Sequence, residues 1–170
     1  MPSISLPSGR TNAYTFSPMP LRIYKPTSPG RRKMSSADFT QLTKKEPEKS
    51  LVHGKKRISG RDSAGRISIR RRGGGHKRLE RLVDFCQQGR DGIPGQIVAI
   101  EYDPNRSARL LLVQYSDGQK RYLLAAEGLR TGDTIVSAPQ TKVKVGNRMQ
   151  LRNIPVGYKV YNVELQNGRG

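Results

Sequence analysis

Beyond Arg81 the sequence changes to short apolar and β-branched runs, and this change most limits what the chain can fold into. The runs lie at 82–85, 97–102, 110–115 and 121–124. Gly, Pro, Asn and Asp separate them, so the pattern predicts antiparallel hairpins. Because the strands recur about every ten residues, we expect a small closed barrel without exposed edges, and an OB-like barrel is the first interpretation.

A second β pattern follows from residue 134 onward. Its runs lie at 134–136, 143–145, 149–151 and 158–165. So few strands, in fewer than about 40 residues, bury too little apolar area to offset the entropy of ordering the chain. We therefore expect this second unit to be incomplete by itself, with strand edges that need a partner.

The first 60 residues lack the apolar spacing of a folded core. Residues 1–20 are rich in Ser and Pro, hold one Arg and no acid, and lack the apolar stretch of a secretory signal. We expect a leader or extension there, either a remnant organelle-targeting segment or a plain extension. Residues 21–60 predict a basic extended arm that becomes ordered by threading along RNA, with an ordinary flexible tail as the alternative.

The charge balance points to a nucleic-acid partner. The chain has 32 Lys and Arg against 13 Asp and Glu, a formal net charge of +19 and a pI near 10.7. Such charge repels itself unless phosphates neutralise it, although a merely solubilising basic surface is the alternative. Aromatic residues make up 6% of the chain and Trp is absent, so folded RNA is favoured over a single strand stacked on rings.

The cations are densest between residues 51 and 81, where eleven basic residues accompany two acids, Asp62 and Glu80. Glycines punctuate this stretch, so the cations belong to turns and short extended pieces rather than to one helical face. Helical readout of the DNA major groove is therefore disfavoured. In 70–78, three glycines among five cations let the backbone approach a polyanion closely.

Cofactor, metal and enzyme chemistry find little support in the sequence. The glycine run lacks the spacing and the Ser or Thr after Lys of a nucleotide-binding P-loop, so no cofactor is expected. Cys86 is the single cysteine and is interpreted as a buried structural thiol. With two histidines far apart, we expect no metal site and no catalytic triad, and the protein is not expected to be an enzyme.

Asp84, Glu101 and Asp103 are expected to orient arginines or cap turns, with a catalytic carboxylate pair as the alternative.

Several motifs together resemble the N-terminal part of one family, the bacterial-type large-subunit ribosomal protein two. They lie at 24–27, 47–51, 70–78, 100–106, 118–122, 153–157 and 168–170. The resemblance implies an OB-fold domain followed by an SH3-like barrel, with basic arms that enter ribosomal RNA. It also implies the partners, which are large-subunit rRNA and other large-subunit ribosomal proteins. Because no stretch approaches the roughly 18 consecutive apolar residues of a membrane span, no membrane partner is expected.

The expected organisation follows from the patterns and the resemblance together. Residues 1–20 are a leader or extension, 21–60 a basic extended arm, 61–137 an OB-fold-like RNA-binding domain and 138–170 the incomplete first part of an SH3-like barrel.

The resemblance also assigns residues. The family's rRNA-binding arginine falls on Arg106, and its Gly-Gly-Gly-His-Lys-Arg motif falls on 73–78. Arg106 follows a Pro-Asn turn, which would leave its guanidinium free to bridge phosphate or a base edge. An ion pair of Arg106 with Glu101 or Asp103 is the alternative, and both roles can coexist.

The candidate RNA-binding residues are cations and glycines of the arm, the basic segment and the strands that follow. They are Arg31, Arg32, Lys33, Lys55, Lys56, Arg57, Arg61, Arg66, Arg70, Arg71, Arg72, Gly73, Gly74, Gly75, His76, Lys77, Arg78, Arg106, Lys120 and Arg121.

The sequence also departs from the family it resembles. A full-length member continues through the SH3-like barrel and a long basic tail rich in Gly and His, which this sequence does not contain. We expect either a separate chain that supplies those parts, as in a split organellar gene product, or a truncated chain. A mitochondrial or plastid ribosome is favoured as the location, with a bacterial cytoplasm as the alternative.

The expected function is that of a structural constituent of the large ribosomal subunit that binds rRNA and supports assembly and translation. The alternative is a non-ribosomal OB-type nucleic-acid-binding protein or RNA chaperone. Salt-resistant binding to one rRNA junction would favour the first, and length-dependent binding to oligonucleotides would favour the second.

Overall fold

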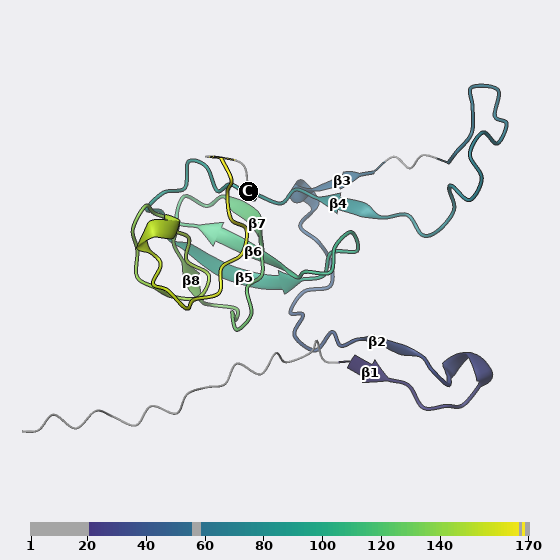
Figure 1. Ribbon diagram of the computed structural model, residues 1–170, viewed down its shortest axis with the longest axis horizontal. Helices are drawn as coiled ribbons and strands as arrows, with labels where there is room; N and C mark the ends of the chain where they lie inside the picture. Colours follow the sequence, from purple (N-terminus) through teal and green to yellow (C-terminus); the bar gives the residue numbers. More distant parts are fainter. Residues whose placement is uncertain (1–20, 56–58, 167, 169–170) are drawn as a thin grey trace, which may run out of the picture. The chain divides into compact units, whose positions relative to one another are not determined.

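The computed structural model describes residues 21–55, 59–166 and 168, and its regular structure is mainly β (Figure 1). The chain divides into two compact units, Met1–Thr40 and Gln41–Gly170. Strand pairing stays within each unit, with one two-stranded sheet in the first and two further sheets in the second.

The first unit contains one short antiparallel hairpin. β1 (Leu21–Ile23) pairs with β2 (Ser35–Ala37), and the 3-10 turn η1 (Pro29–Arg31) lies between them. The proline that begins η1 presets the backbone angle that this turn needs. Part of the stretch predicted as a basic arm is therefore a folded hairpin.

A curled four-stranded antiparallel sheet lies at the centre of the second unit (Figure 1). Its strands are β5 (Gly95–Glu101), β6 (Leu110–Tyr115), β7 (Lys120–Leu124) and β8 (Thr134–Ile135), in the spatial order β7-β6-β5-β8. A register shift between Ile97 and Ala99 marks a bulge in β5, which bends the strand and increases its twist. The sheet accordingly curls into half a barrel, an OB-like arrangement.

Strand β6 is covered on both of its faces. Leu111 and Val113 belong to one buried apolar cluster, whereas Leu110 and Leu112 belong to a second one with Tyr122. Successive side chains of a strand point to opposite faces, so a strand that is buried on both faces has an unbroken apolar sequence. This accounts for the Leu-Leu-Leu-Val run of β6.

The segment before β3 is fastened along the sheet by hydrogen bonds. The Thr43 N–H donates to the Ile100 carbonyl (3.1 Å), and the Ile100 N–H donates to the Thr43 hydroxyl (2.8 Å). The Tyr122 hydroxyl donates to the Glu101 carboxylate (2.6 Å) and accepts from the Glu48 N–H (2.8 Å). These contacts hold an irregular segment against β5 and β7.

A second hairpin carries the basic segment. The 3-10 turn η2 (Lys49–Leu51) leads into β3 (Val52–Gly54), which pairs antiparallel with β4 (Leu79–Arg81). Between these two strands in the sequence lie residues 55–78, of which the structure describes 55 and 59–78, and residues 59–78 form the loop drawn beyond the hairpin in Figure 1. We call it the basic loop.

The predicted fold class and four of the eight predicted strands are confirmed. The mainly β, OB-like fold class is confirmed, and the sheet forms half a barrel. Four predicted runs correspond to observed strands, namely 97–102 to β5, 110–115 to β6, 121–124 to β7 and 134–136 to β8. The predicted strand at 82–85 is wrong, because β4 ends at Arg81 and the chain then lies beside β7 through a single bridge of Val83 with Tyr122.

The strands predicted at 143–145, 149–151 and 158–165 are wrong as well. Among the described residues after Ile135, regular structure is limited to the 3-10 turn η3 (Leu151–Asn153) and isolated bridges. A strand needs a neighbour that pairs with its backbone groups, and the alternating apolar side chains here stay open, Leu165 being 95% exposed. The predicted domain boundaries, including the start of an SH3-like barrel at 138, stay a prediction.

Candidate nucleic-acid interface

The basic loop folds back on itself between residues 60 and 69. The Asp62 N–H donates to the Arg66 carbonyl (2.9 Å), and the Asp62 carboxylate accepts from the Arg66 N–H (2.7 Å). The Arg61 guanidinium donates to the Gly65 carbonyl (2.8 Å). In residues 59–78 Asp62 is the single acid beside seven cations, and its carboxylate closes a turn.

Gly60 forms the base of this small turn. Its carbonyl accepts from the N–H groups of Ser68 (2.9 Å) and Ile69 (3.1 Å). Its φ of 69° lies in the left-handed region, and a Cβ added there would lie 2.5 Å from the Ile69 carbonyl oxygen. Only glycine fits this position without a shift of the backbone.

The chain that follows presents three arginines on a strongly turned backbone. Arg70, Arg71 and Arg72 are exposed, and Arg71 has a φ of 61°. The glycines at 73–75 continue with φ of 98°, 72° and 77°, which glycine adopts without steric cost. This segment therefore brings guanidinium groups and an open backbone to the same surface, as contact with a polyanion requires.

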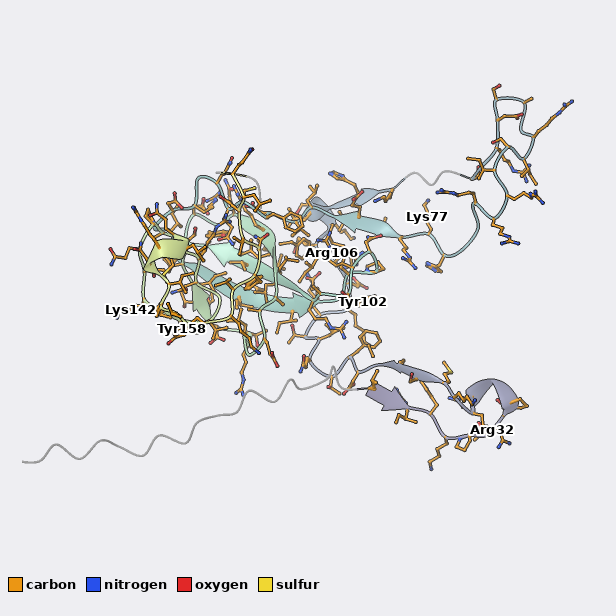
Figure 2. All side chains as sticks on the ribbon, viewed as in Figure 1. Arg32, Lys77, Tyr102, Arg106, Lys142 and Tyr158 are labelled. Carbon is orange, nitrogen blue, oxygen red and sulfur yellow. The ribbon has the colours of Figure 1, made fainter. Side chains whose placement is uncertain are left out.

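The end of the glycine motif meets the turn between β5 and β6. The Arg78 guanidinium donates to the Pro104 carbonyl (3.0 Å), and the Asn105 side-chain amide donates to the Leu79 carbonyl (2.8 Å). Figure 2 labels Lys77 and Arg106, which belong to the two segments that these bonds join. The fold thus brings together two motifs that the sequence singles out separately.

Arg106 lies in this turn and is held by a fully buried carboxylate. Its Nε donates to Asp103 (2.7 Å), and its guanidinium lies 5.6 Å from the centroid of the Phe85 ring. Asp103 also accepts from the Asn105 N–H (2.9 Å). The ion pair with Asp103 that the sequence left as an alternative is therefore present. It engages Nε and fixes the plane of the guanidinium, whose terminal nitrogens are suited to a phosphate or a base edge.

The hairpin of the first unit carries a separate cationic cluster. The guanidinium groups of Arg22 and Arg31 each lie 5.2 Å from the centroid of the Tyr24 ring, close enough for a cation–π attraction. Arg32, labelled in Figure 2, and Lys33 follow η1 on the exposed side. The sequence interpretation omitted Arg22 as a candidate, although Tyr24 directly follows β1 and the i, i+2 spacing of the two residues in an extended chain places both on one face.

Besides Arg106 with Asp103, three of the predicted cations that the structure describes are engaged in ion pairs. The pairs are Lys120 with Glu48 (3.3 Å), Lys55 with Glu80 (3.3 Å) and Arg121 with Asp84. The hydrogen bond from Lys120 is the main cause that lowers the pKa of Glu48. These cations connect neighbouring segments of the protein, so they are weaker candidates for RNA contact than the exposed arginines of the basic loop.

The predicted residues are distributed over two units. Arg31, Arg32 and Lys33 belong to the first, and the others that the structure describes belong to the second, where the basic loop and the Arg106 turn join. Lys56 and Arg57 lie outside the described residues. The assignment of each residue to RNA contact stays a prediction.

Metal-binding clusters and membrane-spanning helices are absent from the described part of the chain. No group of His, Cys, Asp or Glu there is arranged to hold a metal ion. The same residues include no helix with the length and apolar character of a membrane span. The Cys86 thiol, predicted to be buried, is half-buried and donates to the Gly168 carbonyl (2.8 Å).

The chain matches a protein-family model over the segment that carries the basic loop. Residues 48–137, just over half of the 170-residue chain, match the family described as Ribosomal Proteins L2, RNA binding N-terminal domain. The matched range includes the basic loop, β4 to β8 and the Arg106 turn, and it begins after the hairpin of the first unit.

Proposed function

Because the chain belongs to the ribosomal protein L2 family, we propose that it is a structural constituent of the large ribosomal subunit. Residues 48–137 are its RNA-binding N-terminal domain. In this proposal the domain binds large-subunit rRNA, and the bound protein supports subunit assembly and translation. Its partners are the rRNA and other proteins of the large subunit, and its role is structural rather than enzymatic.

The observation that carries the proposal is the junction of the two basic motifs. The hydrogen bonds of Arg78 to Pro104 and of Asn105 to Leu79 fix the basic loop beside the Arg106 turn. Cations from distant parts of the sequence therefore act as one surface. Folded RNA presents phosphates of several backbone segments close together, and such a surface can neutralise them at once.

The parts of this surface have different tasks in the proposal. The exposed arginines at 70–72 neutralise phosphates, and the glycines at 73–75 let the backbone come close to them. Arg106, oriented by Asp103, provides a fixed planar fork for a bidentate contact. In this proposal the charge of the arginines thus provides most of the affinity for RNA, and the oriented Arg106 fixes the position of the RNA on the protein.

Sucrose-gradient sedimentation of cell extract that contains the tagged full chain tests the proposal. We expect the chain to sediment with large subunits at low and at high salt. The Arg78→Ala/Arg106→Ala double variant should move to the top of the gradient at high salt, because it lacks two cations of the interface and the hydrogen bond of Arg78 to Pro104. A wild-type chain that stays free of subunits and binds oligonucleotides in proportion to their length would overturn the proposal in favour of an RNA chaperone.

A further inference from the structure

The basic loop lines an open hollow beside the arginines at 70–72, and neither the family match nor the proposed function says which part of a ligand enters it. Its volume is about 280 Å³, just under the roughly 300 Å³ at which pockets for small organic ligands begin. Ile67 and Ile69 line it together with Arg70, Arg71, Arg72 and Gly73. The hollow has room for one small planar group and none for a helix of RNA.

The walls of this hollow belong to the folded part of the loop. The Gly60 carbonyl binds the N–H groups of Ser68 and Ile69, which sets the two isoleucines on a closed turn. On the other side Gly73 lies against Ser59, where an added Cβ would approach the backbone to 3.3 Å. Local hydrogen bonds and close packing therefore shape the hollow before any ligand arrives.

The lining combines two kinds of chemistry. Ile67 and Ile69 are 65% and 53% exposed, so an apolar surface stays open to water beside three arginines. A phosphate would use the guanidinium groups alone and would leave the isoleucines in water. A ligand with a flat apolar body and an anionic edge would use both, and a nucleotide is such a ligand.

We propose that this hollow receives one unstacked nucleotide of the bound RNA. Its base packs on Ile67 and Ile69, and its flanking phosphates lie on the arginines at 70–72. The inference rests on the proposed function, since it specifies which feature of the RNA this loop recognises. Bases in bulges and loops can leave the stack, whereas the bases of a continuous duplex cannot enter the hollow.

Two RNA hairpins with the same stem test the site on the full chain. One carries a single bulged 2-aminopurine, and the other carries the same base paired within the stem. We expect the chain to bind the bulged hairpin about tenfold more tightly, equivalent to about 1.4 kcal/mol. We also expect the fluorescence of the bulged base to change on binding, because its neighbours change from water to side chains.

Substitutions that keep the charge of the loop test whether the two isoleucines cause the preference for the bulged hairpin. The Ile67→Ser/Ile69→Ser double variant should lose the preference for the bulged hairpin and keep its affinity for the paired one within about twofold. Val156→Ser is the matched control, since it changes a fully exposed apolar side chain outside the loop, and it should bind both hairpins like wild type.

The outcomes separate the site from the function. Equal affinity of wild type for the two hairpins would overturn the nucleotide site and leave the proposed function standing. A bulge preference that survives in the isoleucine double variant would overturn the assignment to this hollow. No binding to either hairpin or to purified large-subunit rRNA would instead overturn the function.

Discussion

Asp62 and Asp103 both lie among cations, and each of them builds a turn. Asp62 accepts from the Arg66 N–H, and Asp103 accepts from the Asn105 N–H and from Arg106 Nε. A carboxylate that accepts backbone N–H groups fixes a local conformation and with it the side chains nearby. At the scale of single residues, these acids orient cations that the candidate interface uses.

Arg106→Ala should weaken binding to purified large-subunit rRNA by about 1–3 kcal/mol, as expected when a bidentate arginine is removed. Filter binding at fixed salt measures the dissociation constant. Arg152→Ala is the matched control, because Arg152 is an exposed arginine outside the RNA-binding domain. Equal affinity of the Arg106 variant and wild type would limit Arg106 to a role in the turn.

Gly60→Ala should weaken rRNA binding several-fold, because the new Cβ would meet the Ile69 carbonyl at 2.5 Å and open the small turn. Gly65→Ala is its control, since Gly65 has a similar φ of 78° but no neighbouring atom within 4 Å. Filter binding and urea unfolding of both variants make the test. We expect the free energy of unfolding to change little in either variant. If the two variants weakened rRNA binding equally, the contact of the new Cβ with the Ile69 carbonyl would not be the cause.

At the scale of elements, a buried hydrogen-bond chain attaches an irregular segment to the sheet. Tyr122 links the Glu101 carboxylate with the Glu48 N–H, and Lys44 lies 3.8 Å from Glu101. Burial raises the pKa of the Glu101 carboxyl. Burial, and then the hydrogen bond with Glu101, raise the pKa of Tyr122. The segment therefore depends on polar groups whose removal leaves partners unsatisfied.

Tyr122→Phe should lower the free energy of unfolding by about 1–3 kcal/mol, because a buried carboxylate loses its donor and a backbone N–H loses its acceptor. Urea denaturation at neutral pH measures the change. Tyr158→Phe is the control, since Tyr158 is exposed, and it should unfold like wild type. A Tyr122 variant as stable as wild type would show that water replaces the hydroxyl at no cost.

Glu101 should make stability depend on pH in a defined direction. Its pKa in the folded protein is raised above the value of 4.5 of the free group. Between the pKa of the unfolded state and that of the folded state, the folded protein therefore binds more protons than the unfolded chain. The free energy of unfolding consequently falls as pH rises through this range. Urea denaturation from about pH 4 to pH 8 compares wild type with Glu101→Gln. The difference in unfolding free energy, wild type minus variant, should decline as pH rises, and a constant difference would contradict the burial argument.

At the scale of the whole molecule, the net charge of +19 makes RNA binding a salt-dependent equilibrium. Counterions leave the RNA when cations approach its phosphates, and their number sets how steeply the affinity falls with salt. The three exposed arginines at 70–72 should therefore account for a measurable part of this dependence.

The triple Arg70→Gln/Arg71→Gln/Arg72→Gln variant should bind RNA with a shallower salt dependence. We expect the slope of log K against log salt to change by about 2–3, at roughly 0.7–0.9 for each phosphate that is no longer neutralised. Binding isotherms over a series of KCl concentrations measure it. Arg130→Gln, an exposed arginine between β7 and β8, is the control, and an unchanged slope in the triple variant would show that these arginines neutralise no phosphate.

The success of the sequence predictions depended on the range of the interactions involved. β5, β6 and β7 were predictable because alternation, apolar runs and turn residues act over a few positions. The run at 158–165 has the same alternation but forms no strand, because alternation does not provide a neighbour to pair with. The basic loop could be named as a candidate site from its composition, whereas the hollow beside Ile67 and Ile69 could not.

Residues close together along the chain specify the β character of the protein, its charge, the position of the basic loop and its family, so these follow from the sequence without a structure. The folded chain was needed to reveal that Arg78 meets the Pro104 turn, that Asp103 holds Arg106 and that Tyr122 fastens the Glu48 segment. The hydrogen bonds of Arg78 and Tyr122 join residues 26 and 74 positions apart. Such pairs form only when the sheet has curled and brought its edges and turns together, so no local pattern specifies them.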